Sequence, residues 1–529
     1  MKIGIFLGYG PQVKLGKEGL GRYVGGLING FQEQNHEVTI ACPFWLKDTV
    51  FELLDTFFID KSKINLITTH SNPPLWKIYN IFYKKRKIKR EKIKRILVIK
   101  NFFDRLLKNI GGSNSFFEMF FWGIILFLFF IAIFIPVLFF CIFYFIYLFK
   151  KNYKKLIKIE TSSKSNKFFK KIKDKIIFGD DIKLQIFYNM YDSVLNKLVN
   201  IINNNTKVDV WFIPAIFWPQ VNYIKGTVVI NAPDLVSQEF PFGFTDVYGS
   251  DVAIKRCRET LLNGKYFITY CEFLRKNLLI EQYGKKTINT LSIRHANNDM
   301  APYITIDKNL TKNLMPENNW SDIFARVIIK GYVEPNVRYI FYASQIRPSK
   351  NMLNLVKAYE ILLREKFITH KLYVTADLEK ETEVSEYIKK HRLENDIISI
   401  YNVPAQTLAA LYHCADLVVN PTLYEGGFPF TFGEGMSVGT PSIMSDIPQV
   451  REVLEVEGLK DIMFDPFDIH SIADKIEWAL SNLDNLYQKE LVLYKKMSQR
   501  SYSLVAEEYV NALQKFIEYD KQNLSEIYR

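Results

Sequence analysis

The sequence contains little cysteine, and the cysteines that it does contain show no pattern. Five occur in 529 residues, at Cys42, Cys141, Cys257, Cys271 and Cys414. Their separations match neither a disulfide framework nor the closely paired Cys and His residues of a zinc site. We therefore expect a protein of a reducing compartment that holds no metal.

The sequence has neither a long apolar run at its beginning nor recognisable internal repeats. Residues 1–7 are too short an apolar run for a secretory signal and lead directly into a glycine-rich loop, so we expect the body of the protein in the cytoplasm. No repeat of solenoid period occurs. A chain of 529 residues is too long for one hydrophobic core, so two domains are expected.

Charge is missing from one long segment. The 31 residues from Met119 to Phe149 include no charged side chain. As a single α-helix this segment would measure about 46 Å, more than the ~30 Å of bilayer hydrocarbon. Because none of its faces is polar, the pattern is not that of a helix in a soluble core. We expect the segment to be embedded in a membrane.

Both ends of this apolar segment are expected on the same face of the membrane. The strands predicted before it, such as residues 2–7, and after it, such as residues 209–213, must build one sheet. Two complete spans need about 40 residues, more than the segment offers. Pro136, midway along it, removes a helical hydrogen bond where a turn is required. The sequence thus predicts a re-entrant hairpin over residues 119–149, with a full span as the open alternative.

Basic residues flank the apolar segment on both sides. Residues 77–108 hold 13 Lys and Arg against two acids, and residues 150–175 hold 11 Lys against two acids, so the net charge of +13 originates here. Such loops prefer the cytoplasmic side and bind anionic lipid head groups. No helix-turn-helix or zinc spacing lies nearby, so membrane lipids are favoured as partners of residues 77–175 and no nucleic acid is expected.

The most informative motif runs from Asp416 to Asp446. An apolar strand pattern leads into a loop with two glycines, and a helical pattern over residues 429–438 follows. Glu425 and Glu434 flank this loop at the carboxyl edge of a parallel sheet, where open α/β folds bind ligands. The free N–H groups of the helix favour a phosphate, and two acids suit the hydroxyls of a sugar or a ribose.

Two further loops point to the same ligand. Gly19 and Gly21 follow a predicted strand and begin a helix, which presents backbone N–H groups to a pyrophosphate, although many nucleotide-binding proteins share such a loop. Arg347 and Lys350 precede a helix that begins at about residue 351. Fixed cations there would stabilise the charge of a departing nucleoside diphosphate. A solvated basic turn is the alternative.

These segments together resemble the retaining glycosyltransferases of the large GT4-like group, which have the GT-B fold of two Rossmann-like domains facing a cleft. The resemblance rests on EGGFPFTFGEGMSVGTP, on GLGRYV and on the turn at Lys350. It implies that Glu425 contacts the donor sugar and Glu434 the ribose. The donor-binding residues by resemblance are Gly19, Gly21, Gly426, Gly427, Phe428 and Glu434, and the catalytic residues are Asp234, Arg347, Lys350 and Glu425.

The chain departs from the family pattern at three places. Eight residues separate the two glutamates, where the family has seven. Gln345 stands where the family usually has Arg, so Arg347 is expected to supply the missing charge. Pro233 replaces a His, so Asp234 either orients the acceptor or caps a helix. His295, near the expected hinge, is of a kind more often structural.

The expected organisation is α/β. Residues 1–310 form an N-terminal Rossmann-like acceptor domain interrupted by the membrane insertion 73–179, residues 311–336 a linker, residues 337–498 the donor domain, and residues 499–529 a helix that crosses back. The expected function is transfer of a hexose from a nucleotide-diphosphate sugar to a lipid-linked or cell-envelope glycan at the cytoplasmic membrane face, without a cofactor. A sugar-nucleotide epimerase, a phosphorylase and a non-catalytic membrane scaffold remain the alternatives.

Overall fold

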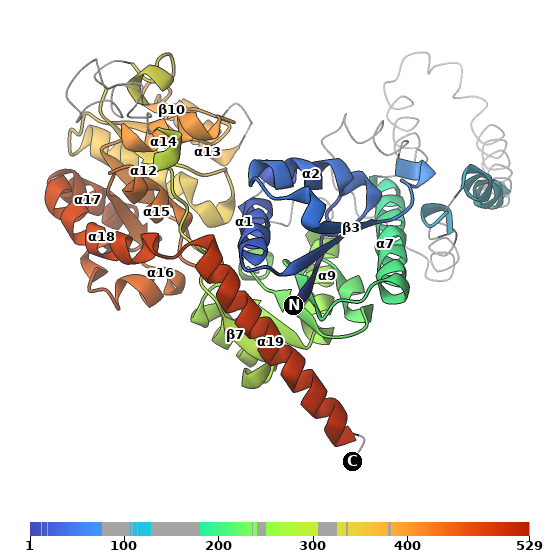
Figure 1. Cartoon of the computed structure of the whole chain (residues 1–529). Helices are drawn as coiled ribbons and strands as arrows, with labels where there is room; N and C mark the ends of the chain where they lie inside the picture. The colour runs from blue at the N-terminus through green and yellow to red at the C-terminus, as the bar shows by residue number, and fades with distance from the viewer. Residues whose placement is uncertain are drawn as a thin grey trace, which may run out of the picture.

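The computed structural model describes most of the chain outside the insertion. The described ranges are 1–11, 13–17, 19–76, 106, 109–113, 115–128, 180–234, 236–240, 250–304, 325–334, 337–378 and 382–527. They form two α/β domains, each built on one parallel sheet, and a long C-terminal helix that connects the two (Figure 1). The expected α/β class is therefore confirmed.

The N-terminal domain is built on seven parallel strands. In sheet order β3-β2-β1-β4-β5-β6-β7 they are Ile64–Thr68, Glu37–Cys42, Lys2–Phe6, Val210–Ile213, Val228–Asn231, Tyr266–Thr269 and Thr290–Ser292. The central strands are short apolar runs because helices cover both faces of a parallel sheet. Pairing of β1 with β4 joins residues on either side of the insertion, as the sequence required.

Helices and shorter turns surround this sheet. The helices are α1 (Gly19–Glu33), α2 (Lys47–Thr56), α7 (Asp180–Asn205), α8 (Val236–Glu239), α9 (Ser250–Asn263) and the π-helix η7 (Leu274–Gln282). The 3-10 turns are η1 (Leu15–Lys17), η2 (Phe44–Leu46), η3 (Lys61–Lys63), η5 (Pro219–Tyr223), η8 (Thr287–Asn289) and η9 (Ala301–Tyr303).

The C-terminal domain repeats the pattern with six parallel strands. In sheet order β10-β9-β8-β11-β12-β13 they are Ile397–Ser399, Lys371–Val374, Tyr339–Tyr342, Leu417–Asn420, Ser442–Ser445 and Met463–Phe464. Its helices are α12 (Met352–Arg364), α13 (Glu383–Lys390), α14 (Ala405–His413), α15 (Phe430–Ser437), α16 (Pro448–Leu454), α17 (Ile469–Leu480) and α18 (Leu483–Ser498), with 3-10 turns η10 (Pro348–Lys350) and η11 (Lys460–Ile462). Most of the segment 311–336 lies outside the described residues.

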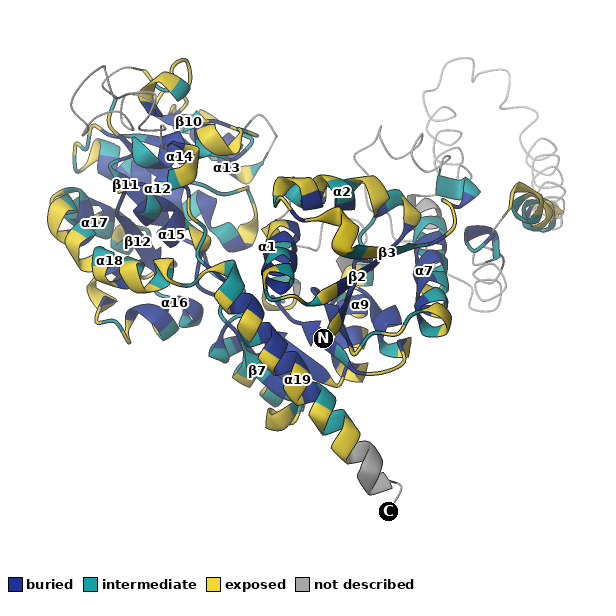
Figure 2. Cartoon of the chain, viewed as in Figure 1, coloured by how far each residue is buried: buried dark blue, intermediate teal, exposed yellow. Residues whose placement is uncertain are grey.

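The last helix, α19 (Tyr502–Ile527), leaves the C-terminal domain and packs along the N-terminal one (Figures 1 and 2). Tyr509, Leu513 and Phe516 are buried in the N-terminal core. The two helices approach closely at glycines of α1: a Cβ atom at Gly30 would lie 2.6 Å from that of Ala506. This contact ties the end of the chain to its beginning.

The predicted membrane insertion lies mainly outside the described residues. Of the apolar segment 119–149, the structure describes residues 119–128, which belong to a helix over residues 116–128. Phe117, Phe120 and Phe127 are exposed on that helix. Within the described ranges, none of the helices combines the length and the apolar character that a bilayer crossing requires. The hairpin and the binding of membrane lipids by the basic blocks stay predictions.

Candidate active site

Two loops of the C-terminal domain meet at the carboxyl edge of its sheet. One follows β8 and contains Lys350; the other follows β11 and contains Glu425. Because β8 and β11 are neighbours in the sheet, their loops are adjacent. Lys350 Nζ forms an ion pair with Glu425 Oε1, and the two side chains are 27% and 18% exposed. The structure thus joins two of the residues that the resemblance called catalytic.

Hydrogen bonds hold these two loops together independently of the ion pair. The Ser349 carbonyl accepts from the Leu423 N–H at 2.8 Å and from Thr422 Oγ1 at 3.0 Å. The hydroxyl of Tyr342 donates to the Lys350 carbonyl at 2.9 Å. The Lys350 backbone is therefore fixed, and its ammonium group stands at the beginning of α12.

The helix α15 presents its first turn to the same region. Its N-cap residue is Pro429, which makes no side-chain capping bond. The unpaired N–H groups at the start of such a helix carry partial positive charge and suit an anion. Arg347 lies nearby but is exposed, and its Nη2 donates to Gln345 Oε1 at 3.2 Å. Gln345, which stands where the family usually has Arg, therefore contacts Arg347, the residue expected to supply the missing charge.

Glu434 is held by residues that the sequence did not single out. Its carboxylate is 8% exposed and accepts from the hydroxyl of Tyr412 at 2.6 Å and from Asn298 Nδ2. Burial raises the pKa of Tyr412 well above its usual value, and the Glu434 carboxylate raises it further. The guanidinium of Arg22 lowers the pKa of Tyr412, so the GLGRYV segment lies close to this site.

The glycine loop touches the N-terminal domain. A Cβ atom at Gly426 would lie 2.1 Å from the Pro233 carbonyl oxygen, and one at Gly427 would lie 2.9 Å from Tyr270 Cβ. Both positions therefore require glycine in this arrangement of the domains. Phe428, next along the loop, is buried in the core of the C-terminal domain.

His295 fixes the end of the same loop. Its Nε2 lies 2.7 Å from the Phe428 carbonyl oxygen, and the ring centroid of Phe430 lies 4.0 Å from that of the imidazole. Its Nδ1 lies 3.0 Å from the Ala296 carbonyl oxygen. Burial lowers the pKa of His295, and the two carbonyl oxygens that face its ring act in the opposite direction. The expectation that His295 is structural gains a definite contact, since the side chain holds the end of the glycine loop.

Asp234, in the N-terminal domain, faces the glycine loop of the C-terminal domain. Its Cβ would lie 3.2 Å from a Cβ atom at Gly426, and its Oδ1 accepts from the Val236 N–H at 3.4 Å, ahead of α8. Burial raises the pKa of Asp234. The Glu425 carboxylate adds to the rise, whereas Lys350 opposes it. The capping contact and the position facing Glu425 coexist, so both sequence interpretations stay open.

Gly19 and Gly21, at the start of α1, differ in the space around their backbones. Gly19 is exposed at the start of α1, and no atom of the described residues lies within 4 Å of the place where its Cβ would stand. At Gly21 a Cβ atom would lie 2.1 Å from the Leu15 carbonyl oxygen. Gly21 is therefore required by the fold itself, whereas Gly19 leaves open space beside the backbone.

The arrangement can bind a negatively charged, hydroxyl-bearing ligand. Lys350, Arg347 and the start of α15 supply positive charge, and Glu425 and Glu434 supply acceptors for hydroxyl groups. In the described part of the chain, His, Cys, Asp and Glu side chains form no group of three or more that could hold a metal ion.

Three residues of the site were not identified from the sequence: Arg22, Asn298 and Tyr412. Arg22 lies inside the segment GLGRYV, and Asn298 lies three residues after His295, so their polar side chains were a usable signal. Tyr412 lies on α14 without any motif around it. Its role depends on packing between α14 and α15, which no local pattern reveals.

Comparison with known proteins identifies relatives of the C-terminal domain. Residues 326–500 match the family model described as Glycosyl transferases group 1. Over 146 residues the chain is 30% identical to O-antigen chain mannosyltransferase B of Escherichia coli, and over 159 residues it is 30% identical to the serotype-specific mannosyltransferase WbdA of Escherichia coli. The alignments cover 27% and 29% of this chain but 37% and 18% of those relatives.

Solved structures resemble the whole chain. A glycosyltransferase from Rickettsia africae superimposes with a TM-score of 0.51 at 14% identity, covering 98% of both chains. Anabaena HepE, solved in complex with UDP, gives a TM-score of 0.52 at 12% identity and covers 97% of this chain and 100% of its own. At such identities the likeness concerns the fold, an α/β arrangement with two parallel sheets.

Proposed function

We propose that this chain, whose residues 326–500 match the glycosyl transferases group 1 family as its resemblance to GT4-like enzymes predicted, transfers a sugar from a nucleotide-diphosphate sugar to a glycan. The sugar retains its anomeric configuration. The proposal rests mainly on one observation: the ion pair of Lys350 with Glu425 lies inside the matching domain and faces Asp234 of the other domain.

In the proposed complex the diphosphate lies against Lys350, Arg347 and the first turn of α15. Glu425 accepts a hydrogen bond from a hydroxyl of the donor sugar, and Glu434 accepts one from the ribose, in addition to those from Tyr412 and Asn298. A carboxylate can accept about four hydrogen bonds, so its two present partners leave room for a ligand.

The proposed reaction follows from this placement. The bond between the anomeric carbon and the leaving phosphate oxygen breaks while the acceptor oxygen forms a bond to that carbon on the same face. The acceptor proton passes to the leaving phosphate oxygen. Lys350 and the helix terminus stabilise the negative charge that develops on the diphosphate, in keeping with the expectation that no cofactor takes part.

Mannose is the first sugar to test, because the curated relatives are mannosyltransferases. The acceptor in this proposal is a lipid-linked or cell-envelope glycan, and the site of action is the cytoplasmic face of the membrane. The apolar and basic segments of the insertion support that location, since they suit an anionic membrane surface. Asp234 is the proposed contact for the acceptor.

The donor can be identified by thermal unfolding of the full-length protein. GDP-, UDP- and ADP-sugars are added one at a time; a donor at 100 times its dissociation constant stabilises by about 2.7 kcal/mol. The stabilising donor is then incubated with a lipid-linked acceptor, and the anomeric configuration of the product is read by NMR. Failure of every nucleotide sugar to stabilise or to be consumed would refute the proposed function.

A pair of variants tests whether the donor binds where we propose. Glu434→Ala is expected to abolish the stabilisation by the donor. The control is Glu457→Ala, which removes a carboxylate of the same domain that forms an ion pair with Lys496 at the surface. Equal donor binding by the two variants would show that the donor site lies elsewhere.

A further inference from the structure

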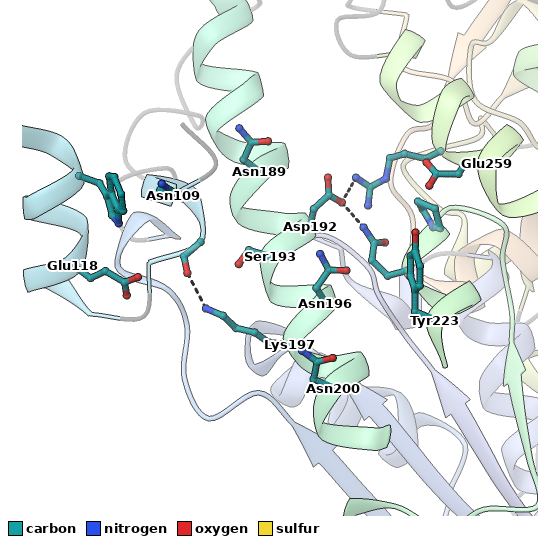
Figure 3. Close-up of a pocket in the computed structure, with 15 residues that line it drawn as sticks. Asn109, Glu118, Asn189, Asp192, Ser193, Asn196, Lys197, Asn200, Tyr223 and Glu259 are labelled. Carbon is teal, nitrogen blue, oxygen red and sulfur yellow. Dashed lines mark hydrogen bonds and ion pairs between the residues drawn. The ribbon is translucent and has the colours of Figure 1, made fainter. Parts of the chain in front are cut away.

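A polar cavity lies on the N-terminal domain, on the side away from the C-terminal domain (Figures 1 and 3). Its volume is about 700 Å³, within the range of ~300–1,000 Å³ that small-molecule sites occupy. The helix α7 lines the cavity, with Asn109 and Glu118 of the insertion on one side of that helix. Residues of η5 and α9 complete it. None of the residues assigned to the transfer site lines this cavity.

The helix α7 is two-sided, and its polar side faces this cavity. Its apolar side, which includes Leu195, Leu198 and Ile202, is buried in the domain core. The cavity side carries amides and a hydroxyl at helical spacing: Asn189, Ser193, Asn196 and Asn200 (Figure 3). Amides both donate and accept hydrogen bonds, and so do hydroxyl groups. A wall of this composition matches a ligand whose hydroxyls also do both.

Charges in the cavity wall are nearly balanced. Three carboxylates, of Glu118, Asp192 and Glu259, line it together with the cations of Lys197 and Arg256. Asp192 forms an ion pair with Arg256 and accepts from Gln220 Nε2 at 2.6 Å. A phosphate or another anionic head group would meet this acidic excess, so an uncharged ligand fits better.

Hydrogen-bonding capacity remains in the wall. Gln220 and Arg256 are 6% and 8% exposed, and Gln220 Oε1 and Arg256 Nη2 find no partner among the described residues. Asn189 Nδ2 is likewise buried without a partner there. A buried polar atom without a hydrogen bond costs about 1–3 kcal/mol, so natural proteins keep few of them without a reason. Two donors and one acceptor suit a polyhydroxyl ligand.

Aromatic rings add the remaining feature of such a ligand site. Trp122 from the insertion and Tyr223 from η5 both line the cavity. Aromatic rings offer an apolar face and a polar edge, which matches a pyranose ring with its C–H face and its hydroxyl rim. The segment at Gly112 is held to α7 by Lys197, whose Nζ donates to the Gly112 carbonyl at 2.9 Å.

We infer that this cavity is a saccharide-binding site that holds an uncharged sugar unit at a distance from the transfer site. Its saccharide chemistry follows from the wall. Its assignment to the acceptor glycan rests on the proposed function. Held beside the membrane insertion, a sugar unit bound here would keep a growing glycan attached to the enzyme between transfers.

Binding of uncharged disaccharides to the full-length protein tests the inference without any donor. Mannobiose and two other disaccharides are compared with inorganic phosphate by saturation-transfer NMR and calorimetry. A disaccharide is expected to bind, and phosphate is expected not to compete. Ser193→Trp, which fills the cavity, is expected to abolish binding, and Asn196→Ala to weaken it about tenfold, the effect of one lost hydrogen-bonding group.

Two controls make the outcomes distinct. Asn204→Ala changes an exposed amide of α7 that does not line the cavity, and it is expected to bind as the parent does. Lys350→Ala is also expected to bind the disaccharide normally. Binding that survives Ser193→Trp, or competition by phosphate, would overturn the inference while leaving the proposed transfer reaction intact. Normal disaccharide binding in a protein that consumes no nucleotide sugar would instead refute the proposed function alone.

Discussion

Removal of the Lys350 ammonium group is the most direct test of the proposed chemistry. In the structure this group forms an ion pair with Glu425 at the start of α12, and both side chains are partly exposed, at 27% and 18%. Such a pair contributes at most about 1 kcal/mol to stability. For a domain of this size the expected decrease in melting temperature is therefore about 2–4 °C.

The effect on the reaction should be much larger. A fixed positive group at the developing charge of a leaving diphosphate resembles a single oxyanion donor, whose removal costs about 10²–10³ in kcat. Lys350→Ala is therefore expected to lower the turnover number by about 10²–10³ and to leave the fold intact. The assay is the initial rate of nucleotide diphosphate release at saturating donor, with thermal unfolding measured on the same preparations.

Two comparisons test whether Lys350 stabilises the diphosphate: a control that removes another lysine, and a double variant that separates this role from neutralisation of Glu425. Lys366→Ala removes a lysine of the same domain that pairs with Asp474 at 2.8 Å and Glu477 at 2.6 Å, and it should retain full turnover. In Lys350→Ala combined with Glu425→Gln, no unpaired carboxylate remains. If the double variant recovers the parent rate, Lys350 only neutralises Glu425 and does not bind the diphosphate.

Three further predictions concern glycines and a buried acid. Gly19→Ala should leave the melting temperature unchanged, so any loss of donor binding by this variant would report the close approach of a ligand. Gly21→Ala should lower the melting temperature of the N-terminal domain, because its Cβ would lie 2.1 Å from a backbone carbonyl oxygen. Equal melting temperatures of the two variants would contradict this prediction. Gly426→Ala should lower the rate of transfer at least tenfold with little effect on domain stability, because its Cβ would lie 2.1 Å from a carbonyl oxygen of the other domain. Small-angle scattering should then report a separation of the two domains. An unchanged scattering profile together with an unchanged rate would refute this prediction. Burial raises the pKa of Glu490, whose oxygens accept from the Ser442 N–H, well above 4.5. The folded state therefore holds a proton that the unfolded state releases, and stability is lost as pH rises above about 4.5. Glu490→Gln should remove this loss, which thermal unfolding at pH 4.5 and 7 would detect as a flatter profile than that of the parent.

The local features of the C-terminal domain were predictable from sequence because each depends on a short segment. The strands at residues 339 and 417, the glycine loop and the helix after it all appear as patterns of apolar residues and glycines. The loops that follow parallel strands gather at one edge of a sheet, so both Lys350 and Glu425 were expected at that edge, and the pairing of β8 with β11 then brings them into contact.

Other parts of the site depend on contacts between distant segments. Glu434 is held by Asn298, 136 residues earlier, and the pattern around Glu434 does not indicate this partner. Gly426 reads as a flexible loop residue, yet it is needed because Pro233 of the other domain touches it. The polar cavity likewise arises from α7 and the insertion, which are apart in sequence.

The sequence by itself determined the two α/β halves, the charged and glycine residues of the loops after β8 and β11, and the apolar, basic character of the insertion, because hydrophobic periodicity and turn residues act within a few positions. Only the tertiary structure decided which residues share a site. Pairing of β1 with β4 brings the two sides of the insertion into one sheet, and α19 packs on α1, so that chain segments several hundred residues apart lie in contact. Burial, pKa shifts and cavity shape depend on those contacts, since each is set by what surrounds a side chain rather than by its neighbours in sequence.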